Sequence, residues 1–170
     1  MYRPQRSEYD PYYETYVSLV PEEDIVTALE RQPAELRELL AGLPEENGFY
    51  AYADGKWSIK QLIGHLIDGE RMFGYRVFRI ARGDETPIEG FEQDGYIEHA
   101  HSNRRTFAEL LEEFKLLRRA NVLFFQNLTD DAWVRVGTAN NAEISVRALA
   151  FIMAGHIRHH IGILRSRYLS

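Results

Sequence analysis

The most informative segment of the sequence is AGHIRHHIGIL, near the end of the chain at residues 154–164. Two of its histidines, His156 and His160, are four residues apart, and residues at this spacing project from one face of an α-helix on successive turns. The same strip carries the apolar residues Leu149, Met153 and Leu164. We therefore expect a helix from about Ser145 to about Arg167 that points both imidazoles into a core.

A third histidine lies far upstream, in the segment LIGHLIDGE at residues 62–70. Ser58, with Gln61 three residues later, forms a capping-box pattern that predicts the start of a helix. One strip of this helix carries Leu62, His65, Gly69, Met72, Arg76 and Ile80. Because His65 shares its strip with apolar residues, we expect the fold to bring it against the other two histidines.

Two more helical patterns bring the number of long helices to four. One begins at the proline and carboxylates of residues 21–24 and ends near Gly42, with a kink or a break expected at Pro33. The other begins at Ser102 or Asn103 and has an apolar residue at every third or fourth position. Its apolar residues are Phe107, Leu110, Leu111, Phe114, Leu117, Phe124 and Leu128. Four such patterns, with no convincing paired strands, predict an all-α four-helix bundle.

The segments between these helices are expected to be loops. Residues 134–143 are polar and contain a glycine and two adjacent asparagines, so we expect no regular element there. The longest linker runs from Gly83 to about His101, and its length permits a crossover between the second and third helices, which leaves an up-down-down-up order open. It carries four residues suited to a lid over a site, Phe91, Gln93, Asp94 and Tyr96.

We divide the chain into an N-terminal arm, residues 1–20, and a bundle domain, residues 21–170. The arm has four tyrosines within eight residues, at Tyr9, Tyr12, Tyr13 and Tyr16. It also contains two prolines, and this composition favours an extended segment over a regular element. We expect the arm to lie along the surface of the domain.

Composition narrows the classes of function. The chain has 170 residues, of which 45% are hydrophobic and 27% charged, which suits one globular domain. It has no cysteine, so any metal must be held by nitrogen and oxygen, and its net charge of −6 argues against nucleic acid as a partner. No apolar run approaches a membrane span, and no apolar signal core follows the first residues. We therefore expect a cytoplasmic protein with no membrane partner.

Three converging imidazoles predict a metal site. Imidazole is a favoured ligand of zinc, nickel, copper and iron, and three protein ligands with one open position form a catalytic pattern. The alternative without a metal is a set of neutral core histidines, each hydrogen-bonded to a carbonyl or a carboxylate. For any single histidine that alternative is the better interpretation, but a shared metal is more economical for all three, because desolvating three unpartnered imidazoles is costly. We expect a divalent ion, zinc or nickel first, with iron and manganese as alternatives.

Residues near His65 on its helix are candidates for supporting roles. Asp68, one turn away, either orients an imidazole through its free ring nitrogen or lies on a solvated flank. Gly69 lacks a side chain on the same side, which would leave room for a ligand. Arg76, further along the strip, either meets an anionic substrate or extends its charged end to the rim.

Other histidines and one aspartate remain as weaker candidates. His159 is an alternative partner for His156, but it is rotated about 100° off the strip, which favours a supporting or surface role. Asp94, in the long linker, is a candidate for the pocket. His99 and His101 are expected to be exposed to solvent.

Three motifs, taken in order, resemble the DinB/YfiT-like superfamily of metalloenzymes. They are GHLIDGE at residues 64–70, TDDAW at residues 129–133 and AGHIRHH at residues 154–160, and the similarity runs from about residue 21 to residue 169. The resemblance implies an up-down-down-up four-helix bundle, a homodimer, and a divalent metal held at the matching positions His65, His156 and His160. Pro33 and the tyrosine-rich arm have no counterpart that we can match in this pattern.

The resemblance also implies a choice of functions, because the family includes thiol-dependent enzymes that use bacillithiol or mycothiol as well as metal-dependent hydrolases. The leading hypothesis is an S-transferase in which the metal lowers the pKa of a low-molecular-weight thiol delivered as a substrate. A close variant is a hydrolase that uses metal-bound hydroxide against an ester or amide. The third hypothesis is a non-catalytic, metal-stabilised module that binds a small molecule or assembles as a dimer. In the first two, the nucleophile is a metal-bound thiol or water and no side chain is assigned to it.

Overall fold

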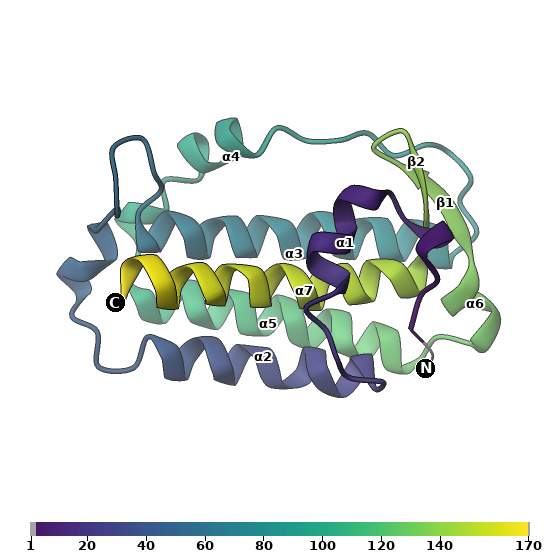
Figure 1. The fold of residues 1–170 in the computed structure, drawn as a ribbon, viewed down its shortest axis with the longest axis horizontal. Coiled ribbons are helices and arrows are strands. Elements are labelled where there is room, and N and C mark those ends of the chain that lie inside the picture. Colours follow the sequence, from purple (N-terminus) through teal and green to yellow (C-terminus); the bar gives the residue numbers. More distant parts are fainter. Residues whose placement is uncertain (1–2, 170) are drawn as a thin grey trace.

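The computed structural model describes residues 3–169, and most of them form a bundle of four long helices (Figure 1). These helices are α2 (Ile25–Leu39), α3 (Ile59–Ala81), α5 (Phe107–Gln126) and α7 (Val146–Ile163). α2 and α7 run in one direction and α3 and α5 in the other, so the bundle has up-down-down-up order (Figure 1). α5 and α7 each pack against both α2 and α3. The prediction of an all-α four-helix bundle is confirmed.

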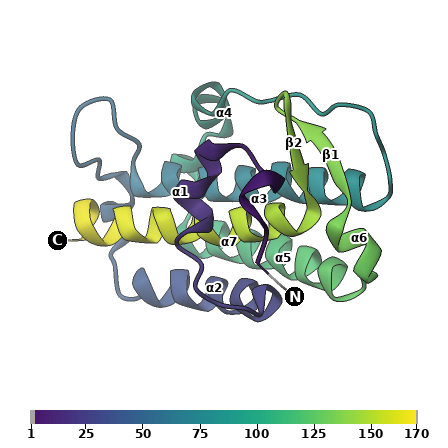
Figure 2. The same cartoon turned by 45° about the vertical axis from the view of Figure 1, so that its right-hand side comes forward.

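Shorter elements cover the ends and one side of the bundle (Figures 1 and 2). The short helical segments are η1 (Arg6–Glu8), η2 (Pro11–Tyr13), α1 (Glu14–Val17), η3 (Glu45–Phe49), α4 (Gln93–Ala100), η4 (Ser102–Arg104), α6 (Asp130–Val134) and η5 (Leu164–Tyr168). The two strands are β1 (Val136–Ala139) and β2 (Ala142–Ser145). η5 extends α7 as a π-helical turn, so the last helical segment ends close to the expected residue.

Side-chain caps fix where the long helices begin. The Ser58 hydroxyl accepts from the Gln61 amide and caps α3, as the sequence predicts. The expected cap of α5 at Ser102 or Asn103 is wrong, because Thr106 caps that helix in a reciprocal pair with Glu109. The earlier residues form the separate turn η4. A Thr-x-x-Glu box satisfies two free amides at once, which outweighs a lone serine a few residues upstream.

Of the kink or break expected at Pro33, the break is absent, because α2 continues through this residue. A proline in a helix leaves the carbonyl four residues earlier without its usual donor. Here that carbonyl belongs to Leu29, and Nη1 of Arg118 donates to it from α5 at 3.4 Å. A side chain from a neighbouring helix therefore replaces part of the missing backbone hydrogen bond.

The segments expected to be loops contain regular structure. The linker after α3 includes α4, whose one buried side chain, Ile97, anchors it to the bundle. Residues 136–145 form an antiparallel hairpin, with Val136 opposite Ser145 and Ala139 opposite Ala142. Its two turn residues, Asn140 and Asn141, both have positive φ, 52° and 62°. Such a turn suits two asparagines, so this hairpin was readable from the sequence.

The arm is not extended: residues 6–17 form short helical turns that cross α7 (Figures 1 and 2). Val17 and Val20 are fully buried, and Arg3 donates to their carbonyl oxygens at 2.6 and 2.7 Å. Gly155 of α7 permits this close packing, because a Cβ there would lie 2.0 Å from the carbonyl oxygen of Tyr16. The arm therefore packs as part of the folded structure.

A layer of polar side chains divides the core into two apolar halves. One half contains Leu29, Phe73, Phe125 and Phe151, and the other contains Leu36, Leu66, Phe114 and Ile161. The buried polar residues between them come from all four long helices: Gln32 of α2, His65 and Glu70 of α3, Arg118 of α5, and His156 and His160 of α7. In the part of the chain that the structure describes, no helix is both long and apolar enough to cross a membrane.

Candidate metal centre

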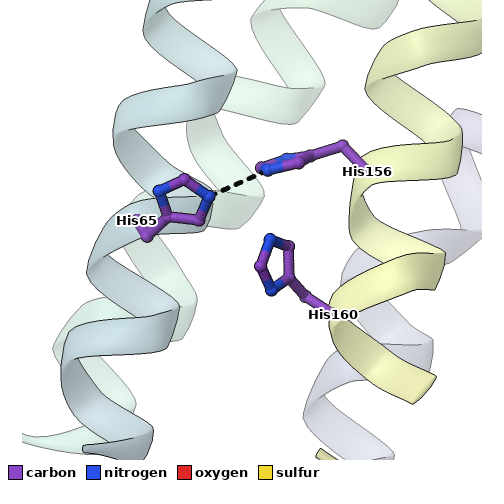
Figure 3. A group of neighbouring side chains, drawn as sticks. All are labelled: His65, His156 and His160. Atoms are coloured by element: carbon purple, nitrogen blue, oxygen red, sulfur yellow. Dashed lines mark hydrogen bonds between the residues drawn. The ribbon is translucent and has the colours of Figure 1, made fainter. Parts of the chain in front are cut away.

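Three imidazoles converge in the middle of the bundle (Figure 3). His65 comes from α3, and His156 and His160 come from successive turns of α7. Their ring centroids are 4.7 to 4.9 Å apart, and one ring nitrogen of each lies within 4.8 Å of the others. All three side chains are buried. The predicted convergence of the three rings is confirmed, and we call this group the three-histidine cluster.

Burial keeps the three-histidine cluster uncharged. Together with a smaller contribution from neighbouring imidazoles, burial lowers the pKa of His65 to about 4 and that of His160 to about 3. The pKa of His156 also lies well below its ordinary value, mainly because of burial. Imidazoles that are neutral at neutral pH have a free lone pair on one ring nitrogen, which is the form that binds metals.

The contacts within the cluster fit a bound cation. Nε2 of His65 and Nε2 of His156 face each other at 2.9 Å, where they can share only one proton, and a ring nitrogen of His160 points toward them (Figure 3). Three nitrogens around a tetrahedral zinc, with Zn–N distances of about 2.0–2.1 Å, would lie about 3.3 Å apart. The ligand nitrogens here lie within 4.8 Å of one another, and those of His65 and His156 are 2.9 Å apart. No carboxylate belongs to the group within residues 3–169.

Aromatic rings and a glycine hold His156 in place. A Cβ on Gly69 would lie 3.0 Å from Cε1 of His156, so the space expected for a ligand holds this imidazole instead. The rings of Tyr16 and Phe73 lie 5.4 and 5.6 Å from the His156 ring. On the other side, Trp57 lies 4.8 Å from the ring of His65. The cluster is therefore fixed by packing as well as by its own helices.

A cavity of about 140 Å³ opens beside the cluster and is lined by His65 and His156. It is formed by the arm, α3, the start of the crossover, the hairpin turn and α7. The remaining lining residues are Tyr12, Tyr13, Tyr16, Gly69, Phe73, Arg76, Gly90, Phe91, Gln93 and Asn140. The expected lid is thus present in part, because Phe91 and Gln93 reach the cavity.

Some predicted pocket residues lie elsewhere. Asp68 faces a separate hollow beside α4 that it shares with Tyr96, and it makes no hydrogen bond to His65; burial raises its pKa. Asp94 is exposed in the first turn of α4 and does not line the cavity. His159 is half-buried, with its ring 5.0 Å from that of His160, and stays outside the cluster.

The expectation for His99 and His101 holds, since both are exposed. The cavity is also lined by residues that were not predicted to form a site: the arm tyrosines, Phe73 and Asn140. The tyrosines and prolines of the arm did not show which surface the arm covers. Asn140 reaches the cavity only because the hairpin pairs with the crossover, through hydrogen bonds of 2.9 Å between Ile88 and the hairpin backbone.

Comparison with known proteins finds a matching family and several similar proteins. A model of the DinB superfamily matches residues 28–164. A protein of Bacillus mycoides (strain KBAB4), named "Putative metal-dependent hydrolase", is 24% identical over 156 residues, 89% of this chain and 90% of that protein. A protein with the same designation from Oceanobacillus iheyensis is 26% identical over 141 residues, 81% of this chain and 79% of that protein.

One solved structure shares the fold. It is YfiT from Bacillus subtilis, described as "a probable metal-dependent hydrolase with an unusual four-helix bundle topology". The match has a TM-score of 0.76 at 20% sequence identity and covers 95% of this chain and 88% of that one. At this identity the match bears on the fold alone, and it agrees with the order of helices described above.

Proposed function

Because the chain belongs to the DinB superfamily, we propose that the three-histidine cluster binds a divalent metal and that the protein is a metal-dependent hydrolase of small molecules. The observation that carries the proposal is the convergence of three buried, neutral imidazoles beside a cavity. The designations of its relatives support hydrolysis as the reaction class. The nitrogen donors favour zinc or nickel, with iron and manganese as alternatives.

Different residues would bind the metal, exclude water and limit the size of the substrate at such a site. A divalent ion held there would polarise a substrate carbonyl and make a coordinated water easier to deprotonate. His65, His156 and His160 supply the ligands from two rigid helices. The rings of Tyr16 and Phe73 exclude water from the edge of His156, which strengthens electrostatic interactions in the site. The small cavity limits the substrate to a small molecule.

A thiol-dependent transferase is the second candidate, and one observation favours it. The cavity lining of this chain, among the described residues, contains no aspartate or glutamate to act as a general base. A hydrolase gains from such a base, whereas a thiol is already far more acidic than water and needs less help to form its anion. A low-molecular-weight thiol would then be the second substrate.

The test combines metal analysis with assays in the presence and absence of thiol. Protein purified without a metal-affinity tag is analysed for bound metals, then assayed on a panel of small esters, amides and electrophiles. We expect about one ion per chain, hydrolysis that stops on chelation, and loss of both ion and activity in His156→Ala. His99→Ala, at an exposed histidine, is the matched control and should keep both.

Each result decides between the candidates. Turnover only with added thiol replaces the hydrolase by the transferase. A bound ion with no turnover on either panel, and a lower melting temperature in His65→Ala, would leave a metal-stabilised binding module. Protein that contains no metal and does not take up zinc or nickel would contradict the proposal as a whole.

A further inference from the structure

Two arginines are buried inside this protein, and only one has an anionic partner. Arg118 is 1% exposed, and it donates to both carboxylate oxygens of Glu70 at 2.7 and 2.8 Å. It also donates to Gln32 and to the carbonyl of Leu29. Its charge is neutralised and its donors are used, as a buried guanidinium requires.

Arg76 is equally buried, at 2% exposure, but lacks such partners. Its Nη2 donates to the carbonyl of Glu89 over a long 3.3 Å, and its Nε is buried with no acceptor. No ion pair joins it to any carboxylate within residues 3–169. The ring of Phe73 also lies near the guanidinium, with its centroid 6.0 Å from Cζ. Leaving a buried cation without a counter-charge is costly, so this arrangement calls for an anion from outside the chain.

The guanidinium of Arg76 lies on the same cavity as the three-histidine cluster. Arg76, His65 and His156 all line it. Phe73 is near both groups, since its ring centroid lies 6.0 Å from Cζ of Arg76 and 5.6 Å from the centroid of the His156 ring. A small molecule in this cavity can therefore meet the guanidinium with one group and the histidines with another.

The wall beside Arg76 is held by backbone contacts. Gly90 lies so close to the hairpin turn that a Cβ there would be 2.3 Å from Oδ1 of Asn140. The amide of Ile88 donates to Thr138, and its carbonyl accepts from Asn140, each at 2.9 Å. The carbonyl of Glu89 is thus fixed in front of Nη2, and Arg76 lines the cavity while its buried Nε has no acceptor.

We propose that Arg76 recognises an oxyanion of the substrate, so that the substrates are small molecules with a carboxylate or phosphate at one end and the reactive bond at the other. The proposal rests on the proposed function for the reaction, but not for the binding of the anion. The Nε and Nη donors of a guanidinium form a planar fork that matches two oxygens of such a group. A cavity of about 140 Å³ admits only a small example.

Binding is tested by calorimetry on the protein as purified, with butyrate, inorganic phosphate and uncharged butyramide as probes. Wild type should bind butyrate or phosphate at least tenfold more tightly than butyramide, because charge-assisted hydrogen bonds are lost with the amide. R76Q should bind that anion at least tenfold more weakly, and R76K, which keeps the charge but not the fork, should lie between. R82Q is the matched control, since Arg82 is exposed at the end of the same helix.

Metal content measured on the same samples separates this inference from the proposed function. R76Q should keep the metal content of wild type and still lose the anion; repeating the titration after chelation shows that the anion does not bind through the metal. Wild type without metal that still binds the anion through Arg76 would contradict only the proposed function. Anion binding by R76Q within twofold of wild type would overturn the inference. Should R76Q not fold, wild type that prefers neither anion over butyramide would overturn it as well.

Discussion

At the scale of single residues, two glycines of α7 look alike in the sequence and have opposite surroundings. A Cβ on Gly155 would lie 2.0 Å from the backbone oxygen of Tyr16, whereas nothing lies within 4 Å of a Cβ on Gly162. Gly155→Ala should destabilise the protein by about 1–3 kcal/mol and displace the arm, because backbone cannot yield as a side chain can. Gly162→Ala should be neutral or stabilise by up to about 1 kcal/mol.

Urea unfolding of both variants measures these changes. Limited proteolysis within residues 3–20 reports whether the arm has left α7. Equal stability of the two variants would show that the arm does not pack on Gly155 as described.

A second residue-scale prediction separates the adjacent histidines of α7. His160 belongs to the three-histidine cluster, and His159 stays outside it. Under the proposed function, His160→Ala should lose most of the bound metal, while His159→Ala should retain it, because removing one of three ligands leaves an incomplete site. Elemental analysis of the two proteins, purified side by side, tests this. Metal loss in His159→Ala alone would exchange the roles of the two residues.

At the scale of elements, the arm is fastened to the start of α7 by an ion pair. Glu8 accepts from Arg147 and from the Ser145 hydroxyl, each at 2.7 Å. Burial raises the pKa of Glu8, but the hydrogen bonds from Arg147, the Gln5 amide and Ser145 outweigh it, so the pKa lies below its ordinary 4.5. A carboxylate with a lowered pKa stabilises the fold above pH 4.5, and this contribution is lost as the pH falls through the lower folded-state value.

Glu8→Gln should therefore lower stability by about 1 kcal/mol at neutral pH, since the pair is only partly buried. The difference from wild type should shrink as the pH falls below 4.5 and vanish at the acid end. Urea unfolding across a pH series measures it. A difference that stays constant with pH would mean that the carboxylate charge does not fasten the arm.

At the scale of the whole molecule, the buried polar layer ties the four long helices together. Arg118 of α5 pairs with Glu70 of α3 and with Gln32 of α2, and Gln32 donates to the Ala154 carbonyl of α7 at 2.8 Å. Glu70→Gln should cost about 3–5 kcal/mol, because it leaves a buried guanidinium without its counter-charge. Glu112→Gln breaks an exposed pair with Lys115 and should change stability by less than about 0.5 kcal/mol.

Thermal and urea unfolding of Glu70→Gln and Glu112→Gln test the role of the layer. Similar small losses of stability in both variants would indicate that the layer is hydrated.

The homodimer implied by the family resemblance remains a prediction. Light scattering at several protein concentrations would measure the oligomeric state directly.

Local sequence patterns correctly predicted the number of long helices, the cap of α3 and which histidines face the core. These features depend on periodicity and on capping side chains within a few residues, which are local. The sequence also predicted the three-histidine cluster, because imidazoles that share a strip with apolar residues are expected to face the same core.

The surroundings of those histidines depend on tertiary contacts. α4 is anchored to the bundle by the buried Ile97, and α2 continues through Pro33 while Arg118 of another helix donates to the Leu29 carbonyl. The arm lies over α7 because Gly155 leaves room for the backbone of Tyr16. Within residues 3–169, Arg76 borders the cavity without an anionic partner, whereas Arg118 pairs with Glu70. These contacts join residues far apart in the chain. A local sequence pattern therefore cannot show that Arg118 pairs with a carboxylate while Arg76 does not.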